Sequence, residues 1–258
     1  MEALDLSGKT ALVLGIANRW SIAYAIADAL YTQGARLAVT YQNERVKDEV
    51  HKLTSDWQNV LHLPCELTDD AQIDTVRDQI QAEFGQLNYL IHCVAFAERD
   101  DLQDPFRDVS RSGFHTAMDI SAYSLVAVAR RMAPLMPAGD SSMITLTYMA
   151  SERVVPNYNV MAIAKAALEN SVRYLANDLG PLGIRVNAIS AGPVRTASAR
   201  AVAGFTGMLK QHADKAPLRR NISTEEVGKA ALYLCSNLSS GVTGTVHFVD
   251  AGYHILGL

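Results

Sequence analysis

The sequence has no apolar run that approaches the roughly 20 residues of a transmembrane helix. It also has no dense cluster of lysine and arginine, and its formal net charge is −4, which argues against a nucleic-acid partner. Intrinsic disorder is excluded, because 49% of the 258 residues are hydrophobic and only 19% are charged. We therefore expect a soluble globular protein with no membrane or nucleic-acid partner.

Cysteine is scarce, and Cys65, Cys93 and Cys235 lie far apart without a C-x-x-C pair. This usage is typical of small buried side chains in a reducing compartment. Residues 1–6 are acidic where a secretory signal is basic, and no apolar signal segment follows. The seven histidines have none of the spacings of metal ligands. We expect a cytoplasmic protein without a metal site.

Short apolar, β-branched runs alternate with segments of helical periodicity along the chain. This alternation predicts a parallel sheet with helices on both faces. Right-handed connections then favour an α/β fold: a single-domain, Rossmann-like, doubly wound sheet of about seven strands within residues 1–258. The predicted strands are Thr10–Leu14, Arg36–Tyr41, Val60–Pro64, Tyr89–Cys93, Met143–Thr147, Arg185–Ile189 and Val246–Val249. The predicted helices are Ser21–Gln33, Asp70–Phe84, Phe114–Met136, Asn159–Leu179 and Thr224–Leu234.

Two stretches depart from this alternation. Ala97–Gly113 is polar and irregular, and Pro193–Ala216 has no clean period. Each follows a predicted strand and therefore belongs at the carboxyl edge of the sheet, where open α/β sheets bind ligands. Both are candidate binding loops, and Pro193–Ala216 is also a candidate lid.

The turn after the first strand contains Gly15 and, six residues later, Ser21. A dinucleotide pyrophosphate binds at such a turn, because the following helix offers free N–H groups and the positive end of its dipole. The usual G-x-G-x-x-G is absent, so a plain turn with a serine cap remains an alternative. After the second strand, neutral Gln42 suits a ribose hydroxyl and favours NADH, whereas Arg45 leaves NADPH open.

Tyr158 and Lys165 are seven residues apart, nearly two helical turns, so their side chains face the same way. A lysine in this position stabilises a phenolate and bridges to ribose hydroxyls, and the phenol is a donor for a developing oxyanion. The alternatives are an amphipathic tyrosine at a helix start and a surface lysine. The small apolar neighbours within Ala162–Leu168 favour a partly buried lysine.

Several motifs together resemble the bacterial NADH-dependent enoyl-[acyl-carrier-protein] reductases, a divergent branch of the short-chain dehydrogenase/reductase superfamily. Ordinary members of that superfamily have Tyr-x3-Lys with an upstream serine, but this sequence has Ala162 and Tyr148 at those places. The similarity extends over nearly the whole chain. The motifs are Gly15 with Ser21–Ala23, Tyr41–Gln42, Ala95–Ala97, Asp119–Ser121, Asn157–Met161 with Lys165, Arg185–Thr196, Ala216–Arg220 and Val249–Gly252.

The resemblance implies reduction of the trans-2 double bond of an enoyl thioester, the last step of the fatty acid elongation cycle, with hydride from NADH. It implies Tyr148, Tyr158 and Lys165 as catalytic residues. The implied cofactor-binding residues are Gly15, Ser21, Ile22, Gln42, Glu66, Leu67, Val94, Lys165, Val194, Arg195, Thr196, Ala197 and Ser198. The implied substrate-binding residues are Ala97, Tyr148, Tyr158, Phe205 and Met208.

Glu66 departs from the family, which usually has aspartate there. The resemblance also implies a substrate carried on acyl carrier protein and a homotetramer. Within the candidate lid, Phe205 and Met208 suit an acyl chain, unless the segment is an ordinary surface helix. The alternatives to this function are a short-chain dehydrogenase or ketoreductase that acts on a carbonyl, and a nucleotide-binding protein without catalysis.

Overall fold

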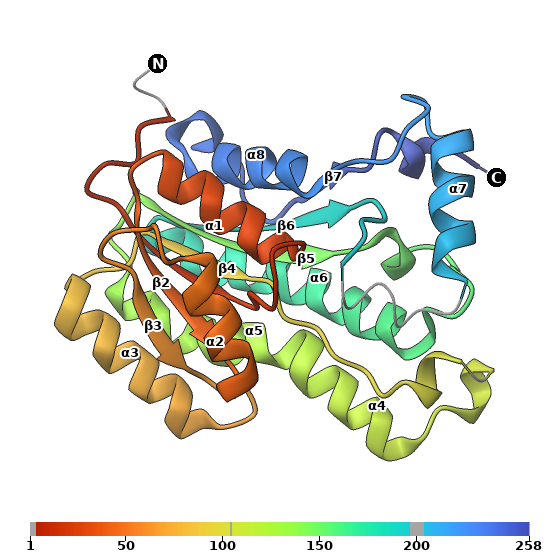
Figure 1. Cartoon of the computed structure of the whole chain (residues 1–258), viewed down its shortest axis with the longest axis horizontal. Coiled ribbons are helices and arrows are strands. Elements are labelled where there is room, and N and C mark those ends of the chain that lie inside the picture. The colour runs from red at the N-terminus through yellow and green to blue at the C-terminus, as the bar shows by residue number, and fades with distance from the viewer. Residues whose placement is uncertain (1–3, 104, 197–203, 258) are drawn as a thin grey trace.

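One parallel sheet of seven strands, in the order β3-β2-β1-β4-β5-β6-β7, forms the centre of the computed structural model, which describes residues 4–103, 105–196 and 204–257 (Figure 1). The order reverses beside β1, as in a doubly wound sheet, and this confirms the predicted α/β fold. The strands are β1 (Thr10–Leu14), β2 (Arg36–Tyr41), β3 (Leu61–Pro64), β4 (Tyr89–His92), β5 (Ser141–Thr147), β6 (Ile184–Ala191) and β7 (Val246–Val249).

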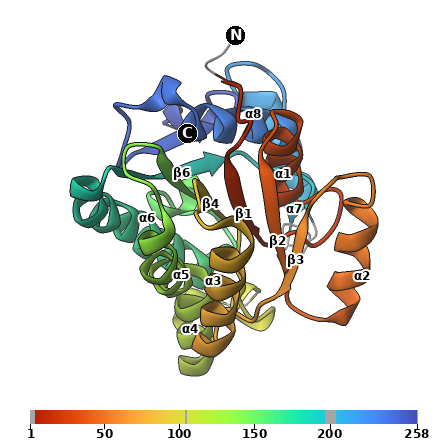
Figure 2. The ribbon, with the colours of Figure 1, turned by 90° about the vertical axis from the view of Figure 1, so that its left-hand side faces the viewer.

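Successive side chains of a strand point to opposite faces of the sheet. Each face of this sheet packs against its own apolar core. In β1, Ala11 and Val13 belong to one apolar core, and Leu12 and Leu14 belong to the other. Helices α1 (Ile22–Thr32) and α8 (Thr224–Cys235) cover the first face (Figure 2). The second face is covered by α3 (Asp70–Phe84), α5 (Ser124–Met132) and α6 (Asn159–Leu179). None of the helices in the described ranges is both long and apolar enough to cross a membrane.

The predicted helix Phe114–Met136 is wrong as a single element. The structure has α4 (Arg111–Met118), a π-helical turn over Asp119–Tyr123, and then α5. Within the turn, the Ser121 hydroxyl donates to the carbonyl oxygen of Phe96 and accepts from its N–H, each at 2.9 Å. Such turns are frequent at functional sites, and this one fastens the helix to the loop after β4.

Two helices were not predicted. Helix α2 (Glu44–Leu53) is mostly polar, and its short apolar stripe consists of Val46, Val50 and Leu53, of which only Val50 is fully buried. Helix α7 (Phe205–Lys215) lies in the segment expected to be irregular, and it buries Leu209 and His212 against the protein. The candidate lid therefore contains a regular helix.

Helix α1 begins at the glycine turn, and α8 packs closely against it. A Cβ placed on Gly228 of α8 would lie 2.7 Å from the carbonyl oxygen of Ala25 in α1. Glycine at this crossing therefore sets the distance between the two helices, and through it the position of the α1 N-terminus.

We expect Gly228→Ala to lower the free energy of unfolding by about 1–2 kcal/mol, because overpacking outweighs the higher helix propensity of alanine. Gly207→Ala in α7 is the matched control, since a Cβ there meets no atom within 4 Å. The control should gain up to about 1 kcal/mol. Urea unfolding of both variants tests the pair, and equal effects would refute the close crossing.

Candidate active site

A cavity of about 650 Å³ lies along the carboxyl edge of the sheet. Its wall uses the ends of six neighbouring strands, from β3 to β6, which spans five strand spacings or about 24 Å. This volume is in the usual range for ligand sites. The predicted site residues that line it are Gly15, Ser21, Ile22, Gln42, Glu66, Leu67, Val94, Ala97, Tyr148, Tyr158, Lys165, Val194, Thr196, Phe205 and Met208.

Of the predicted cofactor residues that the structure describes, Arg195 alone does not line the cavity. It is exposed to solvent. Ala197 and Ser198 lie outside the described residues. The wall also contains side chains that sequence reasoning missed, including Leu102, Ile120, Met161 and the free thiol of Cys93. Ile120 and Met161 lie within motifs of the resemblance but had no site role assigned, and Leu102 lies in the irregular Ala97–Gly113 segment, which no motif marks.

The glycine turn has room for backbone only. Gly15 has a φ of 100°, and a Cβ on it would collide with the carbonyl oxygen of Cys93. The Ser21 hydroxyl does not cap α1 but donates to the carbonyl oxygen of Asn18 at 2.5 Å. The alternative of a plain turn with a serine cap is therefore wrong, because the Ser21 side chain does not cap the helix. The first N–H groups of α1 remain available, as a dinucleotide pyrophosphate requires.

At the β2–β3 end of the cavity, two polar side chains form a pair. The Gln42 amide nitrogen donates to the Glu66 carboxylate at 2.6 Å. The backbone N–H of Thr68 donates to the other carboxylate oxygen at 3.2 Å. Partial burial opposes ionisation of Glu66, but the hydrogen bonds from Gln42 and Thr68 outweigh it and lower the carboxyl pKa. A fixed negative charge therefore stands at this end.

Near the β5 end of the cavity, Lys165 of α6 is buried, with 5% of its surface exposed. Its Nζ donates to the carbonyl oxygen of Leu146 at 2.7 Å. Burial lowers the pKa of the amine to about 8, and the nearby Cys93 and Glu169 partly oppose this shift. Glu169 is itself buried one turn along α6, where its carboxylate accepts from the Thr147 hydroxyl at 2.6 Å. The predicted partly buried lysine is confirmed.

Tyr148 and Tyr158 lie side by side, with ring centroids 5.1 Å apart and planes tilted by 58°. Burial raises the pKa of Tyr148 to about 12, and the pKa of Tyr158 is also raised, first by burial and then by Tyr148. Desolvation favours the protonated phenol in the ligand-free protein, and stabilisation of a phenolate by Lys165 stays a prediction. A protonated phenol is a hydrogen-bond donor.

The backbone around Tyr158 has an unusual conformation. Asn157 and Asn159 on either side have φ angles of 65° and 38°. Asparagine tolerates this left-handed region better than most residues, and such strained positions gather at functional sites. Tyr158 caps the start of α6, so this turn determines how the phenol enters the cavity.

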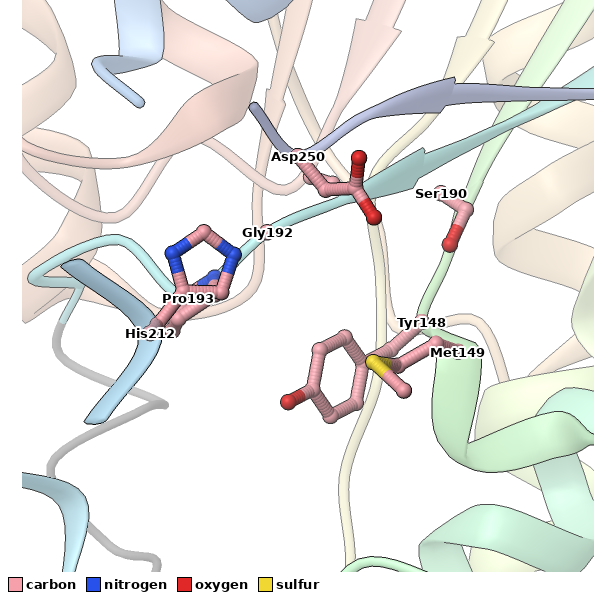
Figure 3. A pocket seen from close by; sticks show the side chains of 8 residues that line it. Tyr148, Met149, Ser190, Gly192, Pro193, His212 and Asp250 are labelled. Carbon is pink, nitrogen blue, oxygen red and sulfur yellow. The ribbon is translucent and has the colours of Figure 1, made fainter. Parts of the chain in front are cut away.

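A small enclosed space lies behind Tyr148, bordered by Gly192, His212 and Asp250 (Figure 3). His212 comes from α7 and is 3% exposed, and neither ring nitrogen has a hydrogen-bond partner among the described residues. Its ring stacks on Tyr253 at 4.6 Å. One turn before His212, the Met208 sulfur accepts from the Tyr148 hydroxyl at 3.5 Å. Helix α7 therefore contacts Tyr253, which follows β7, through His212, and it contacts Tyr148 through Met208.

Within the described ranges, no cluster of three or more His, Cys, Asp or Glu residues could hold a metal ion.

Two arginines near α7 are engaged within the chain. Arg220 pairs with Glu226 at 2.7 Å. Arg219 donates to the carbonyl oxygen of Asp214 at 2.6 Å. Both guanidinium groups are therefore engaged within the chain.

Comparison with known proteins gives consistent matches over nearly the whole chain. The family model described as "Enoyl-(Acyl carrier protein) reductase" matches residues 15–254. The enoyl-[acyl-carrier-protein] reductase [NADH] FabI of Bacillus cereus is 52% identical over 98% of this chain and 99% of its own. The corresponding protein of Nostoc sp. is also 52% identical, over 99% of this chain and 100% of its own.

Solved structures give the same result. The Bacillus cereus enoyl-acyl carrier protein reductase, crystallised with NADP+ and indole naphthyridinone, has a TM-score of 0.96 at 51% identity and covers 98% of this chain and 99% of its own. The enoyl-(acyl-carrier-protein) reductase of Anaplasma phagocytophilum, in complex with NAD, has a TM-score of 0.94 at 43% identity. It covers 98% of this chain and 96% of its own.

Burial of the Lys165 amine should lower the free energy of unfolding of the ligand-free protein. Its pKa falls from an ordinary 10.5 to about 8 on folding, so between these values the unfolded chain binds a proton that the folded protein has lost. The cost is full below pH 8 and vanishes as the pH rises to 10.5. Lys165→Met should therefore stabilise the ligand-free protein by about 1–3 kcal/mol at pH 7.

Urea unfolding at several pH values measures this gain, which should shrink between pH 8 and pH 10.5. Lys229→Met on the exposed side of α8 is the control and should show no such trend. A Lys165→Met variant that is less stable than the parent at pH 7 would contradict the cost of the buried charge.

Proposed function

The chain belongs to the enoyl-[acyl-carrier-protein] reductase family, and from this premise we propose that Tyr158, Tyr148 and Lys165 perform its reaction at the β5–α6 end of the cavity. The protein is an NADH-dependent enoyl-[acyl-carrier-protein] reductase of type II fatty acid synthesis. The observation that supports the site proposal is that one cavity contains all three side chains together with the glycine turn.

The residues of the cavity suit a dinucleotide along its length. Gly15 and the α1 N-terminus would hold the pyrophosphate, and Gln42 would hold the adenosine ribose. Lys165 would donate to the nicotinamide ribose, because only one of its three donors is engaged by Leu146. When bound, NADH supplies the hydride that adds to the β-carbon of the enoyl thioester.

Tyr158 would stabilise the charge that develops on the substrate. As the β-carbon gains hydride, the electrons of the double bond move onto the thioester oxygen, and a proton then reaches the α-carbon. The phenol of Tyr158 would donate to that oxygen, and its raised pKa keeps the donor proton in place. Tyr148, whose ring lies 5.1 Å away, would help to position the thioester.

The substrate end of the cavity is apolar. Phe205 and Met208 of α7 face the cavity from one side, and Ala97 lines it from the loop after β4. We propose that this wall receives the acyl chain of a thioester carried on acyl carrier protein. Residues 1–258 would form one domain, because β1 to β7 belong to a single sheet.

We also propose a homotetramer in the cytoplasm. Exposed apolar side chains such as Tyr123 before α5 and Ile163 on α6, 53% and 40% exposed, are available for subunit contacts. Sedimentation velocity should give the mass of four chains, and a monomer mass would contradict the assembly. Recovery of the protein in the membrane pellet of fractionated cells would contradict the location.

The function is tested by following NADH absorbance with a crotonyl thioester and, in parallel, an acetoacetyl thioester. We expect oxidation of NADH with the first and none with the second. Reduction of the acetoacetyl substrate alone would favour a ketoreductase instead.

In the same assay, Tyr158→Phe should lower kcat by roughly 10²–10³-fold, the usual cost of losing an oxyanion donor. Tyr174→Phe is the matched control, since Tyr174 lies on the same helix and is 68% exposed. The melting temperature and NADH affinity should stay near those of the parent. Near-native turnover of Tyr158→Phe would exclude the donor role.

A further inference from the structure

Doubly wound dinucleotide folds usually carry an acidic residue at the end of the second strand, where it binds the ribose 2′-hydroxyl. This chain has neutral Gln42 at that place. A carboxylate is nevertheless present, because Glu66 reaches Gln42 from the end of the neighbouring strand β3. The carboxylate at this end of the cavity therefore comes from the end of β3 and not from the end of β2.

The pair is fixed by the register of the sheet. Tyr41 lies opposite Pro64, and the Cys65 N–H donates to the carbonyl oxygen of Tyr41 at 2.9 Å, so the two chains leave the sheet together. The backbone N–H of Glu66 donates to the side-chain oxygen of Gln72 at 2.9 Å. Both the backbone and the carboxylate of Glu66 are thus held in place at the cavity wall.

The hydrogen bond also determines which end of the Gln42 amide faces the ligand. A carboxylate only accepts, so the amide NH₂ must point to Glu66. The amide oxygen is then the group left for a cofactor. It accepts a hydrogen bond from a ribose 2′-hydroxyl, but a 2′-phosphate dianion has no proton to donate to it.

We propose that the Gln42–Glu66 pair selects NADH over NADPH, with Glu66 as the residue that excludes a 2′-phosphate. The inference rests on the proposed cofactor site. Two effects add: Glu66 places a negative charge beside the position of the phosphate, and it turns the acceptor oxygen of Gln42 toward that position. The solved relatives hold NADP+ in one case and NAD in another, so the fold accommodates both and side chains must decide.

Nearby basic groups do not offset this charge. Lys47 of α2 is paired with Glu44 at 3.0 Å. Arg45 is exposed on the same helix, outside the lining of the cavity. Of the described residues that line the cavity, Glu66 is the charged one at the Gln42 end.

The test is Glu66→Gln, which keeps the side-chain length and an acceptor for Gln42 but removes the charge. Isothermal titration calorimetry of the full chain with NADH and with NADPH gives both dissociation constants without any turnover. We expect the NADPH dissociation constant to fall about tenfold, because the variant no longer repels the 2′-phosphate across a partly screened distance. The NADH dissociation constant should change less than about threefold.

Asp48→Asn is the matched control, because it removes one exposed acidic charge from the same helix α2 and leaves the Gln42–Glu66 and Lys47–Glu44 pairs intact. It should not change the ratio of the two constants. Glu66→Ala provides a second charge-free variant if Glu66→Gln fails to fold. An unchanged ratio in the folded Glu66 variant, or an equal shift in Asp48→Asn, overturns the proposal. Failure of the parent protein to bind either dinucleotide would instead refute the cofactor site.

Discussion

Parallel pairing is the constraint on which the rest of this structure depends. Because all seven strands run the same way, their carboxyl ends meet at one edge, and residues as distant in sequence as Gly15, Glu66, Tyr148 and Met208 line one cavity. The central strands are buried on both faces. The side chains that line the cavity therefore come from the ends of the strands and from the turns and helices that follow them. The chemistry is therefore confined to the turns and helices that follow the strands, and the sheet sets their positions.

Within that framework, desolvation determines the state of the reactive groups. The same burial that lowers the pKa of Lys165 raises the pKa of Tyr148 and Tyr158, so the site holds two protonated phenols beside a weakly compensated amine. A neutral phenol is a good donor for an oxyanion, and an under-compensated cation is ready to bind ribose hydroxyls. Both properties cost stability in the ligand-free protein, as is common where an active site is built into a stable fold.

The sequence predicted this architecture where the local pattern and the tertiary environment agree. Helices α3 and α6 and strands β1, β2 and β7 have the predicted bounds, because their apolar residues are the ones that the sheet buries. Helix α2 was missed because its apolar stripe is only three residues long, namely Val46, Val50 and Leu53. The π-helical turn was missed because it depends on a contact between Ser121 and Phe96, 25 residues apart. The spacing of Tyr158 and Lys165 indicates that they are close but not how deeply they are buried, so the raised pKa of the phenol could not be predicted from the sequence. The Gln42–Glu66 hydrogen bond was likewise beyond a sequence pattern, since it joins the ends of two strands.

The central claim is that this edge of the sheet directs hydride to the β-carbon of an enoyl thioester. It is tested most directly by reducing a crotonyl thioester with NADH that carries deuterium at the transferred position of the nicotinamide, and by locating the label in the product with NMR. The account predicts one deuterium on the β-carbon of the butyryl thioester and none from NADH on the α-carbon. Label on the α-carbon, or a reduced product without label, would contradict it.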